Sequence, residues 1–130
     1  MQVSDFVTPN EIEATALAGI EVSTVDSAIK ACEIISSMGK ATPIIKMGDL
    51  GVVYMDVHKI KHQIGFEVDA IDTVAAGDAF NAGFAVALTE GLNVNGAVRF
   101  ACAAGALATT KYGAQSAMPF RNEVDSFLKK

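Results

Sequence analysis

The chain has 130 residues, 51% of them hydrophobic, a mean hydropathy of +0.34 and a net charge of −5. This length suits one domain, and the negative charge gives no electrostatic reason to bind nucleic acid. The longest apolar run, residues 100–108, is far shorter than the ~20 residues that a membrane-spanning helix needs.

The first ten residues contain no apolar stretch typical of a signal peptide, so we expect a cytoplasmic protein with neither a membrane nor a nucleic-acid partner. Residues 3–7 have the composition of the end of a strand. A helix then follows to about Ala18, with Thr8 as its cap, Pro9 at its first position and Glu11 completing a capping box.

Hydrophobic periodicity predicts the remaining elements. A second helix opens at Ser23 or Thr24 and ends at Gly39, and strands are expected over 42–47, 51–57 and 60–70. Helices are expected from Asp78 to Gly91, over 95–110 and over 120–128. Strands that alternate with helices predict an α/β structure with a largely parallel sheet and flanking helices.

Cysteines and histidines do not indicate a disulfide or a metal site. Cys32 and Cys102 lie in apolar helical patterns, which favours buried reduced thiols. His58 and His62 would lie ~13 Å apart on a strand, too far to share an ion.

The stretch AIDTVAAGDAFNAGFAVAL, residues 70–88, passes from a strand to a helix through small residues and one acid. A helix that begins near Ala76 directs unpaired N–H groups and a positive dipole end at whatever precedes it, which suits a phosphate. Asp78 has a plain interpretation too, since an acid in the first turn of a helix gains ~0.3–1 kcal/mol from the dipole. The residues alone leave both interpretations open.

Four motifs occur in one order along the chain: TPNEIEA at 8–14, KMGDLG at 46–51, DTVAAGDAF at 72–80 and KYGAQSAMPFRNEVDSFL at 111–128. Together they resemble the carboxyl-terminal, nucleotide-binding half of the ribokinase (PfkB) family of carbohydrate kinases. The resemblance implies that residues 1–130 form that part of a ribokinase-like fold. It also implies a sheet that is incomplete on its amino-terminal side.

The resemblance implies a reaction as well, in which the γ-phosphate of ATP passes to a ribose hydroxyl. Asp78 would be the general base, and the amides of Ala75, Ala76 and Gly77 would form an anion hole. Asn10 and Glu13 would face the phosphates and the water shell of Mg²⁺. The competing interpretation of this pair is an ordinary helix start, although Glu11 fits the capping role better than Glu13.

Further ligands follow from the same resemblance. The nucleotide would be bordered by Lys46, Met47, Gly48, Asp49, Leu50 and Gly51, and its base by Cys102, for which core packing fits equally well. A K⁺ ion would be held by Asp72, Val74, Ala108, Lys111, Gly113 and Ala117. Ala117 stands where the family can offer Ser, and the lost hydroxyl would weaken the ion unless Ser116 or water replaces it.

The glycine-rich sugar-binding segment and the lid of the family are absent from these 130 residues. We therefore expect ATP and a pentose or similar sugar as ligands, but an activity that is incomplete in the chain alone. An incomplete sheet favours a homo-oligomer or a missing amino-terminal half as the partner. The alternative function is a nucleotide-binding or interaction module without turnover.

Overall fold

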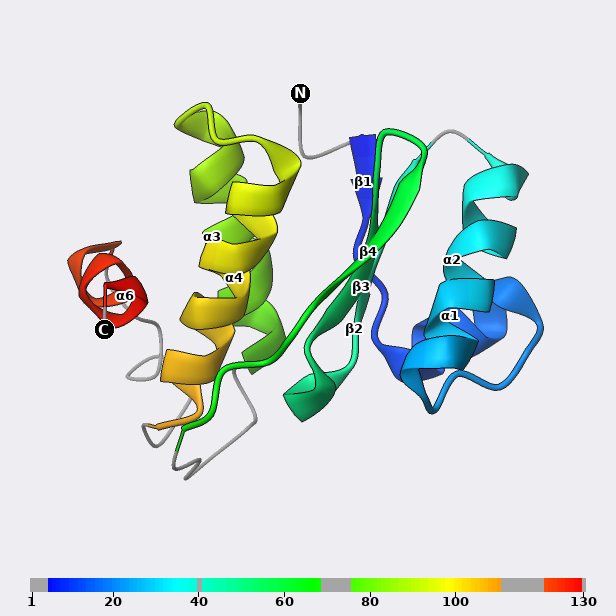
Figure 1. Ribbon diagram of the computed structural model, residues 1–130, viewed down its shortest axis with the longest axis horizontal. Helices are drawn as coiled ribbons and strands as arrows, with labels where there is room; N and C mark the ends of the chain where they lie inside the picture. Colours follow the sequence, from blue (N-terminus) through cyan, green and yellow to red (C-terminus); the bar gives the residue numbers. More distant parts are fainter. Residues whose placement is uncertain (1–4, 40, 69–75, 111–120, 130) are drawn as a thin grey trace. The chain divides into compact units, whose positions relative to one another are not determined.

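The computed structural model describes residues 5–39, 41–68, 76–110 and 121–129 (Figure 1). The chain divides into two compact units, Met1–Gly65 and Phe66–Lys130. The first unit is a small sheet with helices, and the second consists of helices in its described part.

The first unit contains a four-stranded sheet in the order β1-β2-β3-β4. Its elements are β1 (Phe6–Val7), α1 (Glu11–Ala18), α2 (Val25–Met38), β2 (Thr42–Lys46), the 3₁₀ turn η2 (Gly48–Leu50), β3 (Val52–Asp56) and β4 (Lys59–Gln63). The α/β class is confirmed. The expected parallel pairing holds for β1 and β2, whereas β2–β3 and β3–β4 are antiparallel. Tight turns join these two pairs, and a short connection can only reverse the direction of the chain.

Helices α1 and α2 cover one face of this sheet (Figure 1). Ala28, Cys32 and Ile35 form the buried stripe of α2, and they share one core cluster with Ile45 of β2 and Val53 of β3. The predicted start of α2 is confirmed. Thr24 caps it through a reciprocal pair of bonds with Ser27, at 2.9 and 3.1 Å.

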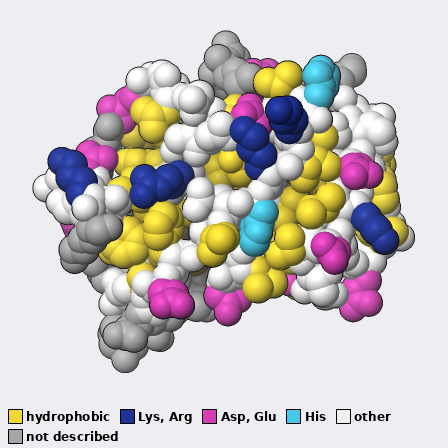
Figure 2. All heavy atoms as spheres, in the orientation of Figure 1, with side chains coloured by type: hydrophobic (Ala, Val, Ile, Leu, Met, Phe, Trp, Pro, Cys, Tyr) yellow, Lys and Arg dark blue, Asp and Glu magenta, His cyan; other side chains and the backbone are white. Residues whose placement is uncertain are grey.

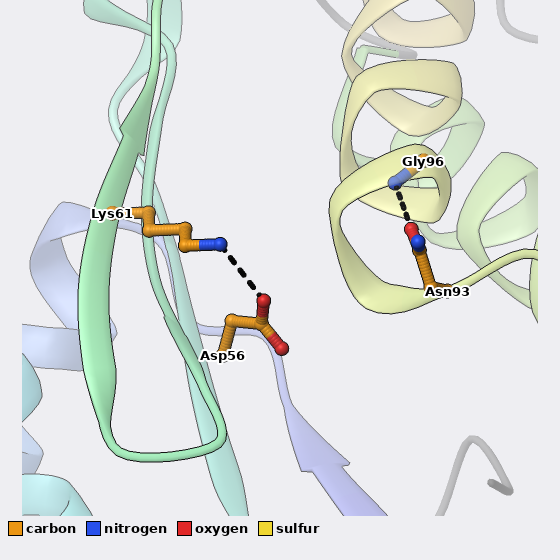
Figure 3. Close-up of polar contacts among 4 residues, drawn as sticks. All are labelled: Asp56, Lys61, Asn93 and Gly96. Carbon is orange, nitrogen blue, oxygen red and sulfur yellow. Dashed lines mark hydrogen bonds and ion pairs between the residues drawn. The ribbon is translucent and has the colours of Figure 1, made fainter.

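The hairpin of β3 and β4 turns on two residues, Val57 and His58, because Asp56 pairs with Lys59. Val57 has φ of +59°, a conformation that β-branched residues rarely adopt. An ion pair of 2.9 Å joins Lys61 to Asp56 across the hairpin (Figure 3).

The strand expected over 60–70 is shorter in the structure. β4 ends at Gln63, residues 64–68 have no regular structure, and residues 69–70 lie outside the described residues. Ile64, inside the expected strand, is 72% exposed. The physical reason is a backbone contact: Gly65 lies against the carbonyl of Asp49, so the chain leaves the sheet there.

The second unit is built on the helix pair α3 (Ala76–Thr89) and α4 (Val94–Ala108). The helix expected from Asp78 is present as α3, and its Phe80, Phe84, Ala87 and Leu88 form a buried stripe. Asn93 caps α4, accepting a bond of 2.8 Å from the N–H of Gly96 (Figure 3).

Helix α6 (Arg121–Leu128) packs on α4. The ring of Phe127 meets the ring of Phe66 edge to face, with 5.3 Å between their centroids, and the guanidinium of Arg99 lies 5.9 Å from the same Phe66 centroid. The aromatic pair and the buried side chain of Val124 hold α6 in place.

Both cysteines are buried free thiols, as predicted. Burial raises the pKa of each thiol to about 12, and the charge of Glu33 adds to the effect at Cys32.

Within the described residues, no helix combines the length and apolarity needed to cross a membrane. Figure 2 shows acidic and basic side chains interspersed with hydrophobic ones over one face of the molecule.

Candidate functional site

The candidate residues of the first unit lie where β1 and β2 end. These two strands are parallel, so their carboxyl ends lie at one edge of the sheet, where α/β folds bind ligands. Lys46 donates its N–H to the carbonyl of Pro9 at 2.9 Å, and Asn10 forms an isolated parallel bridge with Lys46. The segment after β1 and the turn after β2, far apart in the sequence, therefore lie side by side.

Asn10 and Glu13 form the capping box of α1. The Oδ1 of Asn10 accepts from the N–H of Glu13 at 2.8 Å, and an oxygen of Glu13 accepts from the N–H of Asn10 at 3.1 Å. The prediction that Thr8 caps this helix and that Glu11 completes the box is wrong. The carbonyl of Pro9 accepts from Lys46, so it stays outside the helix, and α1 begins at Glu11.

The capping role of Glu13 does not exclude a role toward Mg²⁺. A carboxylate has two oxygens and about four lone-pair directions, and the contact with Asn10 uses one of its oxygens. Both residues are on the exposed side of the helix start. A hydrated cation could therefore approach the same pair that caps α1.

The turn after β2 is held by its own backbone. The N–H of Met47 donates to the carbonyl of Gly51 at 2.8 Å, and the N–H groups of Leu50 and Gly51 donate back to Met47 and Gly48 at 3.1 Å each. Gly48, Asp49 and Leu50 are exposed, whereas Met47 and Gly51 are buried. Among residues 46–51, which were expected to border the nucleotide, Met47 has its side chain in the core. The turn therefore offers a ligand mainly its three exposed residues.

The two glycines of this turn have different surroundings, and each position favours glycine for a different reason. Gly48 has φ of +60° and open space around the position of a Cβ. Gly51 has φ of +93°, and a Cβ there would overlap the backbone of Gln63, Ile64 and Gly65. Gly48 is therefore open to a ligand, whereas the backbone that approaches Gly51 is the end of β4.

His62 contacts this turn and was not expected to do so. Its Nε2 lies 2.6 Å from the carbonyl oxygen of Leu50. The sequence predicts only that His62 lies on a long strand, too far from His58 to share an ion, and no local pattern reveals a contact between residues twelve apart.

The candidate catalytic residues of the second unit lie at the start of α3. Ala76 and Gly77 are half-buried, and Asp78 is exposed in the first turn, where the helix dipole favours a negative charge. Gly105 of α4 faces this turn, since a Cβ on it would lie 3.2 Å from the carbonyl oxygen of Ala76. The lack of a side chain at Gly105 therefore lets α4 approach the backbone that precedes Asp78.

The other predicted positions of the second unit are only partly described. Cys102 and Ala108 are buried along α4, so the side chain of Cys102 belongs to the packed helix pair. Ala75, Asp72, Val74, Lys111, Gly113 and Ala117 lie outside the described residues. Within the described part of the chain, no group of three or more His, Cys, Asp or Glu residues could hold a metal ion.

Known proteins resemble this chain over nearly all of its length. It is 44% identical to the ribokinase of Haemophilus influenzae over 129 residues, 99% of this chain and 42% of that protein. It is 40% identical to the ribokinase of Bacillus subtilis over 123 residues, 95% of this chain and 39% of that protein. The chain thus spans about two fifths of the length of these relatives.

Solved structures agree with the sequence relatives. The ribokinase of Thermotoga maritima has a TM-score of 0.87 and 46% identity, covering 97% of this chain and 42% of that one. The ribokinase of Arabidopsis thaliana, solved with ribose and ATP, has a TM-score of 0.88 and 33% identity, covering 97% of this chain and 41% of that one.

The model of the pfkB family carbohydrate kinases matches residues 1–121. This range includes the strand ends, the turn after β2 and both helices of the α3–α4 pair. The match, together with the ribokinase relatives, shows that the chain belongs to the pfkB family of carbohydrate kinases.

Proposed function

We propose that the chain supplies the nucleotide-binding and catalytic part of an ATP-dependent kinase of ribose or a similar sugar. The observation that carries the proposal is the position of Asp78, exposed in the first turn of α3 directly after the half-buried Ala76 and Gly77. Such a turn combines a base with backbone N–H groups that can face an anion. The similarity to a ribokinase solved with ribose and ATP supports this assignment.

In the proposed reaction, the carboxylate of Asp78 takes the proton of the sugar hydroxyl. The sugar oxygen then forms a bond to the γ-phosphorus of ATP, the bond from that phosphorus to the bridging oxygen breaks, and ADP leaves. The amides of Ala75, Ala76 and Gly77 donate to the charge that develops on the phosphoryl oxygens. Phosphoryl transfer depends mainly on positioning and electrostatics, so the step asks little covalent chemistry of these groups.

Asn10 and Glu13 are proposed to face the nucleotide phosphates and the water shell of Mg²⁺. An amide oxygen and a carboxylate suit this hard ion, which keeps several of its waters and draws charge from the phosphates. The exposed residues of the turn after β2 would border the nucleotide. ATP as the phosphoryl donor is consistent with a cytoplasmic protein.

A K⁺ site beside the anion hole completes the proposal. Of its expected ligands, the structure describes Ala108, the last residue of α4. The carboxyl end of a helix carries a partial negative charge that favours a cation. We expect K⁺ to strengthen ATP binding more than Na⁺ does.

The groups that hold the sugar must be supplied by something beyond the described site. The chain spans 42% of the ribokinase of H. influenzae, so we propose that a second segment, or another copy of the chain, provides them. The alternative function is a nucleotide-binding or interaction module without turnover. The two functions differ in whether added sugar-binding residues restore a reaction.

Reconstitution tests the proposal. The chain is mixed with, or fused to, the remaining amino-terminal part of the H. influenzae ribokinase, and ADP formation is measured with ribose, Mg²⁺ and K⁺. We expect turnover in the assembly, with Asp78→Asn lowering it by about 10²–10⁴-fold, the usual contribution of a general base. ATP affinity should stay within about twofold, because the amide keeps the shape of the side chain.

The matched control is Asp26→Asn. Asp26 is likewise an exposed acid in the first turn of a helix, α2, so it reproduces the interaction with the dipole but not the proposed chemistry. Turnover within a few-fold of the unmutated protein for both variants would leave Asp78 as an ordinary helix-start acid. ATP binding without any turnover in the assembly would favour the alternative function.

A further inference from the structure

The side chain of His62 contacts the backbone of the turn after β2. The Nε2 of His62, on β4, lies 2.6 Å from the carbonyl oxygen of Leu50. A carbonyl oxygen can only accept a hydrogen bond, so Nε2 carries the proton and donates it. This is true of the neutral Nε2–H ring and of the charged ring alike.

The peptide group that His62 contacts is held on its other side as well. This peptide joins Leu50 to Gly51, and its N–H donates to the carbonyl of Gly48 at 3.1 Å. Gly51 has φ of +93°, a conformation that is coupled to the orientation of this peptide. Rotation of the peptide would break both bonds and would turn the carbonyl of Leu50 away from β4.

Backbone contacts place the same strand end against the same turn. Gly51 is closely approached by Gln63, Ile64 and Gly65, and Gly65 lies against the carbonyl of Asp49. The backbone at the end of β4 therefore packs directly against the turn. His62 is the side chain that extends this support to Leu50, which lies on the exposed part of the turn.

We infer that His62 is a positioning residue for the turn after β2, and that it holds the peptide between Leu50 and Gly51 so that Gly48, Asp49 and Leu50 present one fixed backbone to the nucleotide. The functional half of this inference rests on the proposed nucleotide site. A freely rotating peptide could direct the carbonyl of Leu50, the negative end of its dipole, at an anionic ligand. His62 prevents this rotation by donating its Nε2–H to that carbonyl.

Amide hydrogen exchange in the full chain tests the positioning directly, because the N–H groups of Leu50 and Gly51 are bonded within the turn. We expect His62→Ala to raise exchange at these two amides about three- to tenfold, the effect of losing one partly exposed hydrogen bond. His62→Gln should restore at least half of the lost protection, since its amide N–H can reach the same carbonyl. His58→Ala, at the exposed histidine of the hairpin turn, is the matched control and should leave both amides unchanged.

Calorimetry with Mg²⁺ and ATP supplies the second measurement. We expect His62→Ala to weaken binding about three- to tenfold and His62→Gln to recover most of it, while the melting temperature of His62→Ala falls by no more than the few degrees that one lost hydrogen bond costs. Exchange within twofold of the unmutated protein at Leu50 and Gly51, or faster exchange spread evenly over β3 and β4, would overturn the inference. If the unmutated chain binds no nucleotide but His62→Ala still raises hydrogen exchange at the amides of Leu50 and Gly51, the positioning role stands and the proposed function fails.

Discussion

Asn10 and Glu13 bond to each other twice across the first turn of α1, each accepting from the backbone N–H of the other, at 2.8 and 3.1 Å. The same two residues are the proposed neighbours of the phosphates and of hydrated Mg²⁺. One pair is thus assigned a structural contact and a ligand contact, and substitutions can separate the two.

Glu13→Gln should keep the cap and lose the charge. A Gln oxygen accepts from the N–H of Asn10 as a Glu oxygen does, so the free energy of unfolding should stay within about 0.5 kcal/mol. Affinity for ATP with Mg²⁺ should fall severalfold, measured by calorimetry. Glu13→Ala removes both functions and should also lower the free energy of unfolding by about 1 kcal/mol. Unchanged ATP affinity in Glu13→Gln would assign Glu13 to the cap alone.

The two glycines of the turn after β2 should respond differently to alanine. Gly48→Ala meets open space and φ of +60°, so it should cost about 1–2 kcal/mol of stability from the left-handed conformation alone. Gly51→Ala adds a Cβ that overlaps the backbone at the end of β4 and should cost several kcal/mol more, because two backbone segments must separate. Urea unfolding of both variants provides the comparison. Equal costs would contradict the contact between Gly51 and residues 63–65.

Val57→Gly should stabilise the protein. A two-residue hairpin turn with positive φ only at its first position, as at Val57, prefers glycine there, and strain of this kind costs about 1–3 kcal/mol. Because glycine also loses more backbone entropy on folding, part of this relief is offset. We expect the free energy of unfolding, measured in urea, to rise by about 1 kcal/mol. His58→Gly, at the second position of the same turn, is the control and should destabilise. A loss of stability in Val57→Gly would show that the turn carries no strain.

Alkali should destabilise the protein through its two thiols. Burial raises the pKa of Cys32 and Cys102 to about 12 in the folded chain, whereas exposed thiols lose their protons near pH 9. Between pH 9 and pH 12 the unfolded chain has therefore released protons that the folded chain retains. Stability is fully present below pH 9 and is lost as the pH rises toward 12. The urea midpoint should fall from pH 8 to pH 10.5, and it should fall less in the double variant Cys32→Ala/Cys102→Ala.

Local signals in the sequence predicted the elements well, and contacts between distant segments explain the errors. Thr24 and Ser27 form a cap that depends on four neighbouring residues, so its prediction was correct. TPNEIE contains two overlapping capping boxes, from Thr8 and from Asn10. The bond from Lys46 to Pro9 selects the second one, and no local rule contains that bond.

In the candidate site, too, local signals predict some features and contacts between distant segments decide the others. The exposed acid at the start of α3 follows from the motif and from helix periodicity, and the structure places Asp78 there. The contact of His62 with Leu50 depends on where β4 ends and on Gly65 approaching Asp49. An alternating pattern that continues past Gln63 gives no sign that the strand stops there.

The mixed directions of the sheet also order events when the unfolded chain refolds. β2, β3 and β4 are joined by short connections, whereas β1 pairs with a strand that begins at Thr42, more than thirty residues further along the chain. Pairing across a long loop is slower than pairing across a short one. The Asn10 edge of the proposed ATP site should therefore be completed only after the hairpin that supports its other edge.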